Sequence, residues 1–317
     1  VVLASRNTWD FVKACLSSIP RAGVEDYEII VVDNASTDNT VARLKSEFPH
    51  VRTIVNPVNE GHCRAMNQGI AMASAEYVLV LDADTVLWPD SASRLIEFMR
   101  SRADVAIAAP RMLNPDGSIQ ETARTFPSVI NGLFGRQSLL TRLFPDNRFS
   151  RAYMRHDKID ASQPFEVDWV SAAAMIFRRS LPDDIGLWDE DIKGYWVDAD
   201  WCKTAHRAGK VYCVPSAGVT HFEQNRWGKK KGASRIILFH AGAYRFYRKH
   251  FTAGLLDPRA ILAGVALGSR ALLLLSLDSF RRADGKPDPI AVTSSPQLKE
   301  AATTGAQASR SAGAGKQ

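Results

Sequence analysis

The sequence predicts an α/β fold with a mostly parallel central sheet flanked by helices. In the N-terminal third, short apolar runs rich in β-branched residues alternate with segments that have helical patterns. Strands that alternate with helices in this way form right-handed βαβ units, and such units build parallel sheets. The runs end in polar side chains, so we expect the ligand at the carboxyl edge of the sheet.

Two strands open the chain. The first, Val1–Ala4, leads through Ser5-Arg6-Asn7 into a predicted helix at Asp10–Ile19, whose apolar residues recur at helical spacing. The second, Glu28–Val32, ends in a cluster of hydrogen-bond acceptors and is followed by a helix at Thr40–Phe48. Polar loops therefore follow both strands at their carboxyl ends.

The next two predicted strands end near the side chains that most strongly suggest a ligand-binding site. Val51–Val55 is followed by a small-residue helix that opens at Gly61, and Tyr77–Leu81 runs directly into Asp82 and Asp84. Because side chains alternate along an extended chain, these two aspartates are expected on the same side. Paired carboxylates at such an edge suit a divalent cation that carries a diphosphate. The alternative is that Asp-Ala-Asp-Thr only caps the next turn or helix.

Composition points to a globular protein with a localised basic charge. The chain has 317 residues, of which 45% are hydrophobic and 23% charged, with a net charge of +6. The basic residues are concentrated, which favours a local anionic partner over nucleic acid. The 4 cysteines form no C-x-x-C pair. We therefore expect neither a zinc site nor a disulfide framework, and a reducing, cytoplasmic location.

Missing motifs exclude two common nucleotide-binding classes. No G-x-G-x-x-G follows the first strand, which argues against a dinucleotide-binding Rossmann domain, and no P-loop sequence is present. The chain begins inside a strand at Val1, without Met or a basic segment. We expect no signal peptide, and a few residues removed from the start.

Four segments in order resemble the nucleotide-binding half of family 2 glycosyltransferases with the GT-A fold. They read V-V-L-A-S-R-N, I-I-V-V-D-N-A-S-T-D, N-E-G-H-C-R-A-M-N-Q-G and Y-V-L-V-L-D-A-D. Downstream, the sequences at 167–175 and 186–191 resemble the acceptor half of the rhamnosyltransferase-like branch. The resemblance implies a nucleotide-sugar-binding half at 1–110 and an acceptor-binding, catalytic half at 111–251.

The resemblance assigns donor-binding roles at the carboxyl ends of the strands. It implies that Asp33 contacts the pyrimidine base, Asp82 lies near the ribose, and Asp84 binds a divalent cation, Mg²⁺ or Mn²⁺. His221 occupies the position where relatives have a histidine near the metal or diphosphate, although a lone histidine at a strand end is more often structural. Further donor-binding candidates are Ser5, Asn7 and Arg64, the last of which could instead be a solvated helix arginine.

A second group of residues surrounds the candidate general base. Asp198 matches the family aspartate proposed as general base, but Val197 stands where a glutamate is expected. This departure leaves the base in place and puts acceptor specificity in doubt. Asp200 faces another direction on the helix, so we assign it a supporting or capping role. Trp169 and Trp196 are core candidates that could also stack on an acceptor sugar.

The C-terminal part predicts a membrane-associating helical extension. Residues 126–164 read as an insertion or lid, and 225–234 as a basic loop beside the site. Residues 252–282 contain the apolar stretch 260–277, whose single charge is Arg270. An interfacial helix is preferred there over a span or a buried core helix. Residues 283–317 have the composition of a disordered tail.

Together these features predict a metal-dependent inverting glycosyltransferase at the inner face of the cytoplasmic membrane. The resemblance implies transfer of a sugar, such as L-rhamnose from dTDP-rhamnose or a sugar from a UDP donor, to a glycan hydroxyl. The acceptor would be a polyprenyl-diphosphate-linked glycan of the cell envelope. Two alternatives stay open: a polyprenyl-phosphate glycosyltransferase, which needs no strong base, and a catalytically silent sugar-nucleotide-binding protein.

Overall fold

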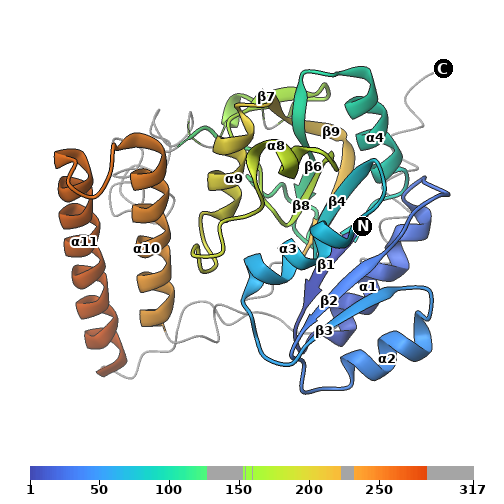
Figure 1. Cartoon of the computed structure of the whole chain (residues 1–317), viewed down its shortest axis with the longest axis horizontal. Coiled ribbons are helices and arrows are strands. Elements are labelled where there is room, and N and C mark those ends of the chain that lie inside the picture. Colours follow the sequence, from blue (N-terminus) through green and yellow to red (C-terminus); the bar gives the residue numbers. More distant parts are fainter. Residues whose placement is uncertain (127–152, 154, 159, 223–231, 284–317) are drawn as a thin grey trace.

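A single mixed sheet forms the centre of the molecule (Figure 1). The computed structural model describes residues 1–126, 153, 155–158, 160–222 and 232–283. Its strand order is β3-β2-β1-β4-β8-β6-β9-β5, and β7 pairs with β9. The strands are β1 Val2–Ser5, β2 Ile30–Asn34, β3 Arg52–Asn56, β4 Tyr77–Asp82, β5 Thr85–Leu87, β6 Val105–Leu113, β7 Phe165–Val167, β8 Ala174–Arg178 and β9 Lys210–His221.

The N-terminal strands pair in parallel, as the alternating pattern predicts. β1 lies between β2 and β4, with Ser5 opposite Asp33 and Ala4 opposite Asp82. This register brings the carboxyl ends of the first, second and fourth strands together. The second half departs from a parallel pattern, because β8 is antiparallel to both β4 and β6, and β5 is antiparallel to β9.

Both faces of the sheet are covered, which is why the central strands β1, β4 and β8 are mostly apolar and buried. Val2 and Val32 face a core that includes helix α3, whereas Leu3 and Val31 face a second core with α1 and α4. The helices are α1 Trp9–Ser18, α2 Thr40–Glu47, α3 His62–Met72, α4 Ser91–Ser101, α8 Leu181–Ile185, α9 Val197–Ala205, α10 Gly232–Phe251 and α11 Pro258–Ala283, with short 3₁₀ turns at Ile19–Arg21 and His156–Lys158.

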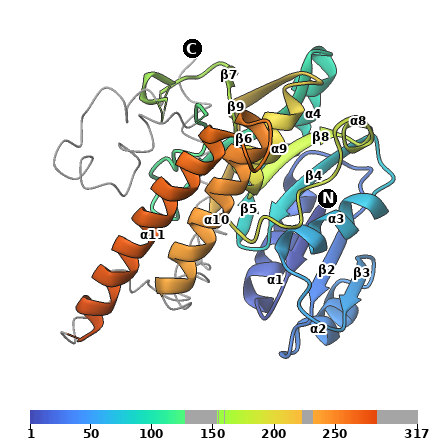
Figure 2. The ribbon, with the colours of Figure 1, turned by 60° about the vertical axis from the view of Figure 1, so that its left-hand side comes forward.

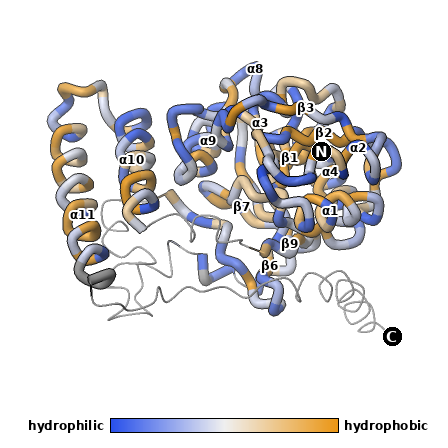
Figure 3. The backbone as a smooth tube through the Cα atoms, turned by 90° about the horizontal axis from the view of Figure 1, so that it is seen from below, coloured by the Kyte–Doolittle hydropathy of each residue, from blue (hydrophilic) through white to orange (hydrophobic). Residues whose placement is uncertain are grey.

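Helices α10 and α11 form a hairpin beside the sheet (Figures 1 and 2). Within α11, Pro258–Ser279 has a mean hydropathy of 2.0 and is 6% buried, and it is the one helix of the described residues that is long and apolar enough to cross a membrane. Apolar segments recur along α11 in Figure 3. This exposure excludes the alternative of a buried core helix.

The one charged side chain within the apolar stretch of α11 is turned toward α10. Arg270 Nη1 lies 2.9 Å from Nε2 of His240, whose Nδ1 donates a hydrogen bond to the Ile236 carbonyl at 2.7 Å. His240 is buried, so the hairpin covers this polar pair. The predicted basic loop lies mainly outside the described residues, as do most of the predicted insertion and the tail after residue 283.

We expect Gly69→Ala to destabilise the domain, because α3 packs directly on the sheet at this residue. A Cβ at Gly69 would overlap Cγ1 of Val2 and lie 3.2 Å from Cγ2 of Val32. Overpacking of this kind lowers the free energy of unfolding by about 1–3 kcal/mol, measured by denaturant titration.

The matched control is Gly268→Ala in α11, where an added Cβ meets nothing within 4 Å. This change replaces a helical glycine in open space, so the free energy of unfolding should stay the same or rise by up to about 1 kcal/mol. Equal destabilisation by both substitutions would contradict the packing argument.

Candidate active site

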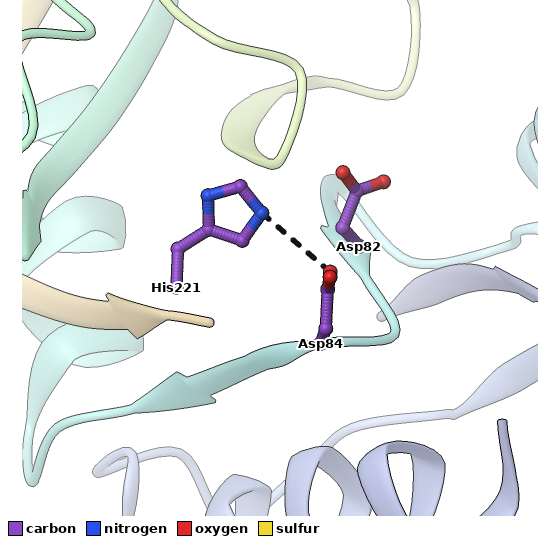
Figure 4. Close-up of side chains that lie close together, drawn as sticks. All are labelled: Asp82, Asp84 and His221. Carbon is purple, nitrogen blue, oxygen red and sulfur yellow. Dashed lines mark ion pairs between the residues drawn. The ribbon is translucent and has the colours of Figure 1, made fainter. Parts of the chain in front are cut away.

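Two carboxylates and an imidazole converge at the carboxyl edge of the sheet (Figure 4). Asp82 ends β4, Asp84 lies in the turn before β5, and His221 ends β9. One ligand atom from each lies within 4.8 Å of the others. The antiparallel pairing of Thr85 with His221 places the histidine beside the turn, and Phe222 N donates to the Asp84 carbonyl at 2.9 Å.

The His221 ring is oriented by a side chain that the sequence pattern did not single out. Gln120 Oε1 lies 3.0 Å from Nδ1 of His221, and Gln120 Nε2 donates to the His221 carbonyl at 2.8 Å. A proton on Nδ1 satisfies Gln120 and leaves the Nε2 lone pair directed at Asp84, whose Oδ1 is 3.5 Å away. This support is typical of metal-binding histidines.

His62 is a second residue that the sequence did not indicate. It opens α3, and its Nε2 lies 3.7 Å from Oδ1 of Asp82, with 33% of each side chain exposed. By contrast, Arg64 is 55% exposed and pairs with Glu60 at 3.4 Å, as a solvated helix arginine would. The N-terminus of α3 therefore presents an imidazole, rather than a guanidinium, to Asp82.

One carboxylate oxygen of Asp33 is buried and has no hydrogen-bond partner among the described residues. Its side chain is fully buried; Oδ1 accepts a hydrogen bond from Ser36 N at 2.9 Å, and Oδ2 has no partner among the described residues. A buried carboxylate oxygen without a donor is costly, so a ligand N–H at this position would be stabilising.

Asn7 and Ser5 support the loops around Asp33. Asn7 has φ of 54°, and its Oδ1 accepts hydrogen bonds from the backbone N–H groups of Thr37 at 2.7 Å and Asp38 at 3.3 Å. Ser5 Oγ lies 3.1 Å from the Thr8 hydroxyl. The Asn7 contacts join the loops after β1 and β2, whereas the Ser5 contact lies within the loop after β1.

Asp198 lies in the first turn of α9 and is half-buried. Burial raises the pKa of its carboxyl above the ordinary value; the Ala199 N–H and the Arg124 guanidinium oppose this shift, and Asp82 adds to it. Asp198 therefore lies within electrostatic range of the carboxylate cluster. A carboxyl group with a raised pKa is a better proton acceptor than an ordinary aspartate.

Three other predicted residues have mainly structural surroundings. Trp169 is 7% exposed, and its Nε1 donates to the Thr125 carbonyl at 2.9 Å. Trp196 packs against the rings of Phe239 and Phe246. Asp200 is directed at α10, where it contacts the side chains of Lys249 and His250, and α9 has no side-chain cap hydrogen bond.

Val197 is 4% exposed and belongs to the core that also contains Trp201. The apolar residue at this position therefore has a packing role. A glutamate in the same surroundings would place a carboxylate in this core, which is unfavourable without a partner.

The cluster of Asp82, Asp84 and His221 fits a divalent cation. Carboxylate oxygens suit Mg²⁺ and Mn²⁺, and an imidazole nitrogen favours a transition metal such as Mn²⁺ in the same site. With a cation bound, the site could neutralise a diphosphate, and Asp198 on α9 lies within electrostatic range of Asp82. The arrangement is chemically suited to displacement at a phosphate-activated carbon.

Comparisons with known proteins identify the family of this chain. The family model "Glycosyl transferase family 2" matches residues 1–182. The chain is 29% identical over 282 residues to the N-acetylglucosaminyl-diphospho-decaprenol L-rhamnosyltransferase of Mycobacterium tuberculosis, covering 84% of this chain and 90% of the relative. It is also 29% identical over 208 residues to the poly-beta-1,6-N-acetyl-D-glucosamine synthase of Staphylococcus epidermidis, covering 63% of this chain and 44% of that protein.

Among solved structures, that of GalNAc-T7 with UDP, GalNAc and Mn²⁺ is similar with a TM-score of 0.52 and 15% identity. The match covers 69% of this chain and 43% of that chain, and it supports the predicted fold. The family model matches more than half of the chain, so the resemblance seen in the strand-end motifs is confirmed: the chain belongs to glycosyl transferase family 2.

Proposed function

We propose that the protein is a metal-dependent, inverting glycosyltransferase that moves a hexose from a nucleoside-diphosphate sugar to an acceptor hydroxyl. The observation that carries this proposal is the cluster of Asp82, Asp84 and His221 within electrostatic range of Asp198, whose pKa is raised by burial. The cluster suits the leaving diphosphate, and Asp198 suits the acceptor proton.

The donor would bind across the carboxyl ends of the first, second and fourth strands. The unpaired Oδ2 of Asp33 is buried, so the adjoining loops would have to move for it to accept a hydrogen bond from the N3–H of a pyrimidine base. Asp82 would lie at the ribose, and Asp84 with His221 would hold Mg²⁺ or Mn²⁺. A bound cation supplies positive charge that stabilises the departing diphosphate.

In this mechanism Asp198 acts as the general base. Its carboxylate takes the proton from the acceptor hydroxyl while that oxygen forms a bond to the anomeric carbon. The bond from this carbon to the diphosphate oxygen breaks on the opposite face, so the configuration inverts. The reaction needs a deprotonated Asp198 within about 3 Å of the hydroxyl.

The acceptor would be a lipid-linked glycan of the cell envelope. The printed name of the mycobacterial relative describes transfer of L-rhamnose to N-acetylglucosaminyl-diphospho-decaprenol. By analogy we propose dTDP-L-rhamnose or a UDP-sugar as donor and a polyprenyl-diphosphate-linked glycan as acceptor. The exposed apolar face of α11 would hold the enzyme at the inner face of the membrane, beside this acceptor.

A donor screen tests the reaction class. We expect release of nucleoside diphosphate from one of dTDP-L-rhamnose, UDP-sugars or GDP-sugars, supplied with a lipid-linked GlcNAc acceptor and Mn²⁺ or Mg²⁺, and loss of release with EDTA. Asp84→Ala should lower the rate at least about a hundredfold, because charge stabilisation of the leaving group is lost.

Asp183→Ala is the control for the donor screen, since Asp183 is 72% exposed on α8 and pairs only weakly with Arg179 at 3.6 Å. It should retain the wild-type rate. Nucleotide-sugar binding without release by the wild type would instead support the silent binding protein.

Asp198→Asn tests the general base. At neutral pH kcat should fall by about 10²- to 10⁴-fold, because the amide cannot take the acceptor proton. In the wild type, kcat should decrease as the pH falls through the raised pKa of Asp198, where the carboxyl becomes protonated. The variant's residual activity should lack this acid limb. Retained activity in Asp198→Asn would favour the polyprenyl-phosphate alternative, whose phosphate nucleophile needs no strong base.

Vesicle flotation tests the membrane contact. The full chain should float with vesicles containing phosphatidylglycerol, and the double variant Leu262→Glu/Leu273→Glu should bind at least about tenfold more weakly, because each buried leucine contributes about 1.5–3 kcal/mol. These leucines are 71% and 60% exposed. Val58→Glu, at a residue 58% exposed on the donor half, should float like the wild type. If the α11 double variant floats with the vesicles as the wild type does, the proposed membrane contact is contradicted.

A further inference from the structure

Asp200 is the most completely buried carboxylate of helix α9. Its side chain is 1% exposed, Lys249 Nζ donates to Oδ2 at 2.6 Å, and His250 Nε2 lies 2.8 Å from Oδ1. The His250 side chain is 4% exposed. Both carboxylate oxygens are thus bonded to consecutive residues of α10, which fixes the carboxylate in position and in rotation.

The same helix carries Asp198 one half-turn away. Residues two apart on a helix are separated by about 200° around its axis, so their side chains leave in nearly opposite directions. Asp198 is within electrostatic range of Asp82 and Arg124, whereas Asp200 is bonded to α10. Helix α9 therefore lies between the donor site and α10, and a displacement of α9 from α10 would move Asp198 relative to the donor.

Helix α10 also holds the loop that leads into α9. Arg245 donates to both carboxylate oxygens of Asp189, at 2.8 and 2.9 Å, and lies 2.7 Å from Asp191. One turn earlier on α10, a Cβ on Gly242 would lie 2.7 Å from the Tyr195 carbonyl oxygen, so the two backbones are in close contact. Helix α10 is thus attached before, at and after the start of α9.

Of these contacts between α10 and the start of α9, the bonds to Asp200 constrain the position of α9 most. A buried carboxylate that loses its hydrogen-bond partners is strongly destabilised, so the position of α9 in which both bonds are made is favoured over displaced positions. The Asp189 carboxylate lies in the loop rather than on α9 and is 13% exposed, against 1% for Asp200, although Lys249 also lies 3.7 Å from Oδ2 of Asp189. The geometry points to Asp200 as the group that sets the position of the helix.

We propose that Asp200, held by Lys249 and His250, is a positioning residue that keeps Asp198 in line with the donor. This inference rests on the proposed role of Asp198 as general base. A misplacement of about 1 Å is enough to lower a catalysed rate by about a hundredfold, so loss of this contact should appear in kcat. Nucleotide binding, which involves the opposite side of the site, should be little changed.

The experiment compares Asp200→Asn, Lys249→Met and the double variant in the full chain. We expect Asp200→Asn to lower kcat by about 10- to 100-fold, with the dissociation constant for the donor's nucleoside diphosphate changed by less than about threefold. Because the two side chains act as one unit, the double variant should lose no more than the worse single variant. Additive losses would overturn the proposal.

Asp257→Asn is the matched control. Asp257 is also a paired carboxylate, and its side chain is 7% exposed and 2.7 Å from the largely exposed Arg259, but it is only half-buried as a residue, lies between α10 and α11 and is not on α9. It should lower the melting temperature while kcat stays within about twofold of the wild type. A loss of kcat equal to that of Asp200→Asn would show a general effect of destabilisation and overturn the proposal.

Hydrogen exchange separates failure of this inference from failure of the proposed function. In Asp200→Asn, the backbone amides of α9 should exchange at least about tenfold faster, while those of β1 and β4 keep their protection. This measurement needs no turnover. If α9 is protected equally in the wild type and in Asp200→Asn, the positioning role is overturned, even if the transferase is active. If the wild type is inactive but α9 exchanges faster in Asp200→Asn, the proposed function is overturned and the positioning contact stands.

Discussion

The pairing of β5 with β9 is the contact on which the candidate site depends. Asp84 lies in the short turn between β4 and β5, and the Thr85 hydroxyl holds this turn by donating to the Asp82 carbonyl at 2.7 Å. The antiparallel pairing of β9 with β5 places His221 opposite Thr85. Without that pairing the chain would present two neighbouring aspartates, and the nitrogen ligand would be absent.

The sequence predicted the residues whose position follows from local periodicity. The parallel strands and the placement of Asp82 and Asp84 at their carboxyl edge follow from apolar runs that end in polar side chains. Gln120 and His62 could not be found in this way, because their contacts with His221 and Asp82 join segments far apart in the sequence. The pairing of β5 with β9 likewise joins segments far apart in the sequence, so no local pattern indicates it.

Helix α9 illustrates the same limit. Helical geometry was sufficient to predict that Asp198 and Asp200 point in different directions, but the partners of Asp200 are 49 and 50 residues away. The sequence around Val197 looked like a departure from the family pattern, and the structure gives it a packing role in the core. Arg64 was an anion-binding candidate by spacing, and in the structure it is exposed and pairs with Glu60, so its role stays a prediction.

The contact between α10 and α11 has a practical consequence for protein production. Removal of α11 to improve solubility would uncover the His240 side chain and the Tyr244 ring, which lies 3.3 Å from the position of a Cβ on Gly264. It would also free one side of the helix that carries Lys249 and His250. A shortened protein that expresses well would therefore present an unsupported α10, and its turnover would understate that of the intact enzyme.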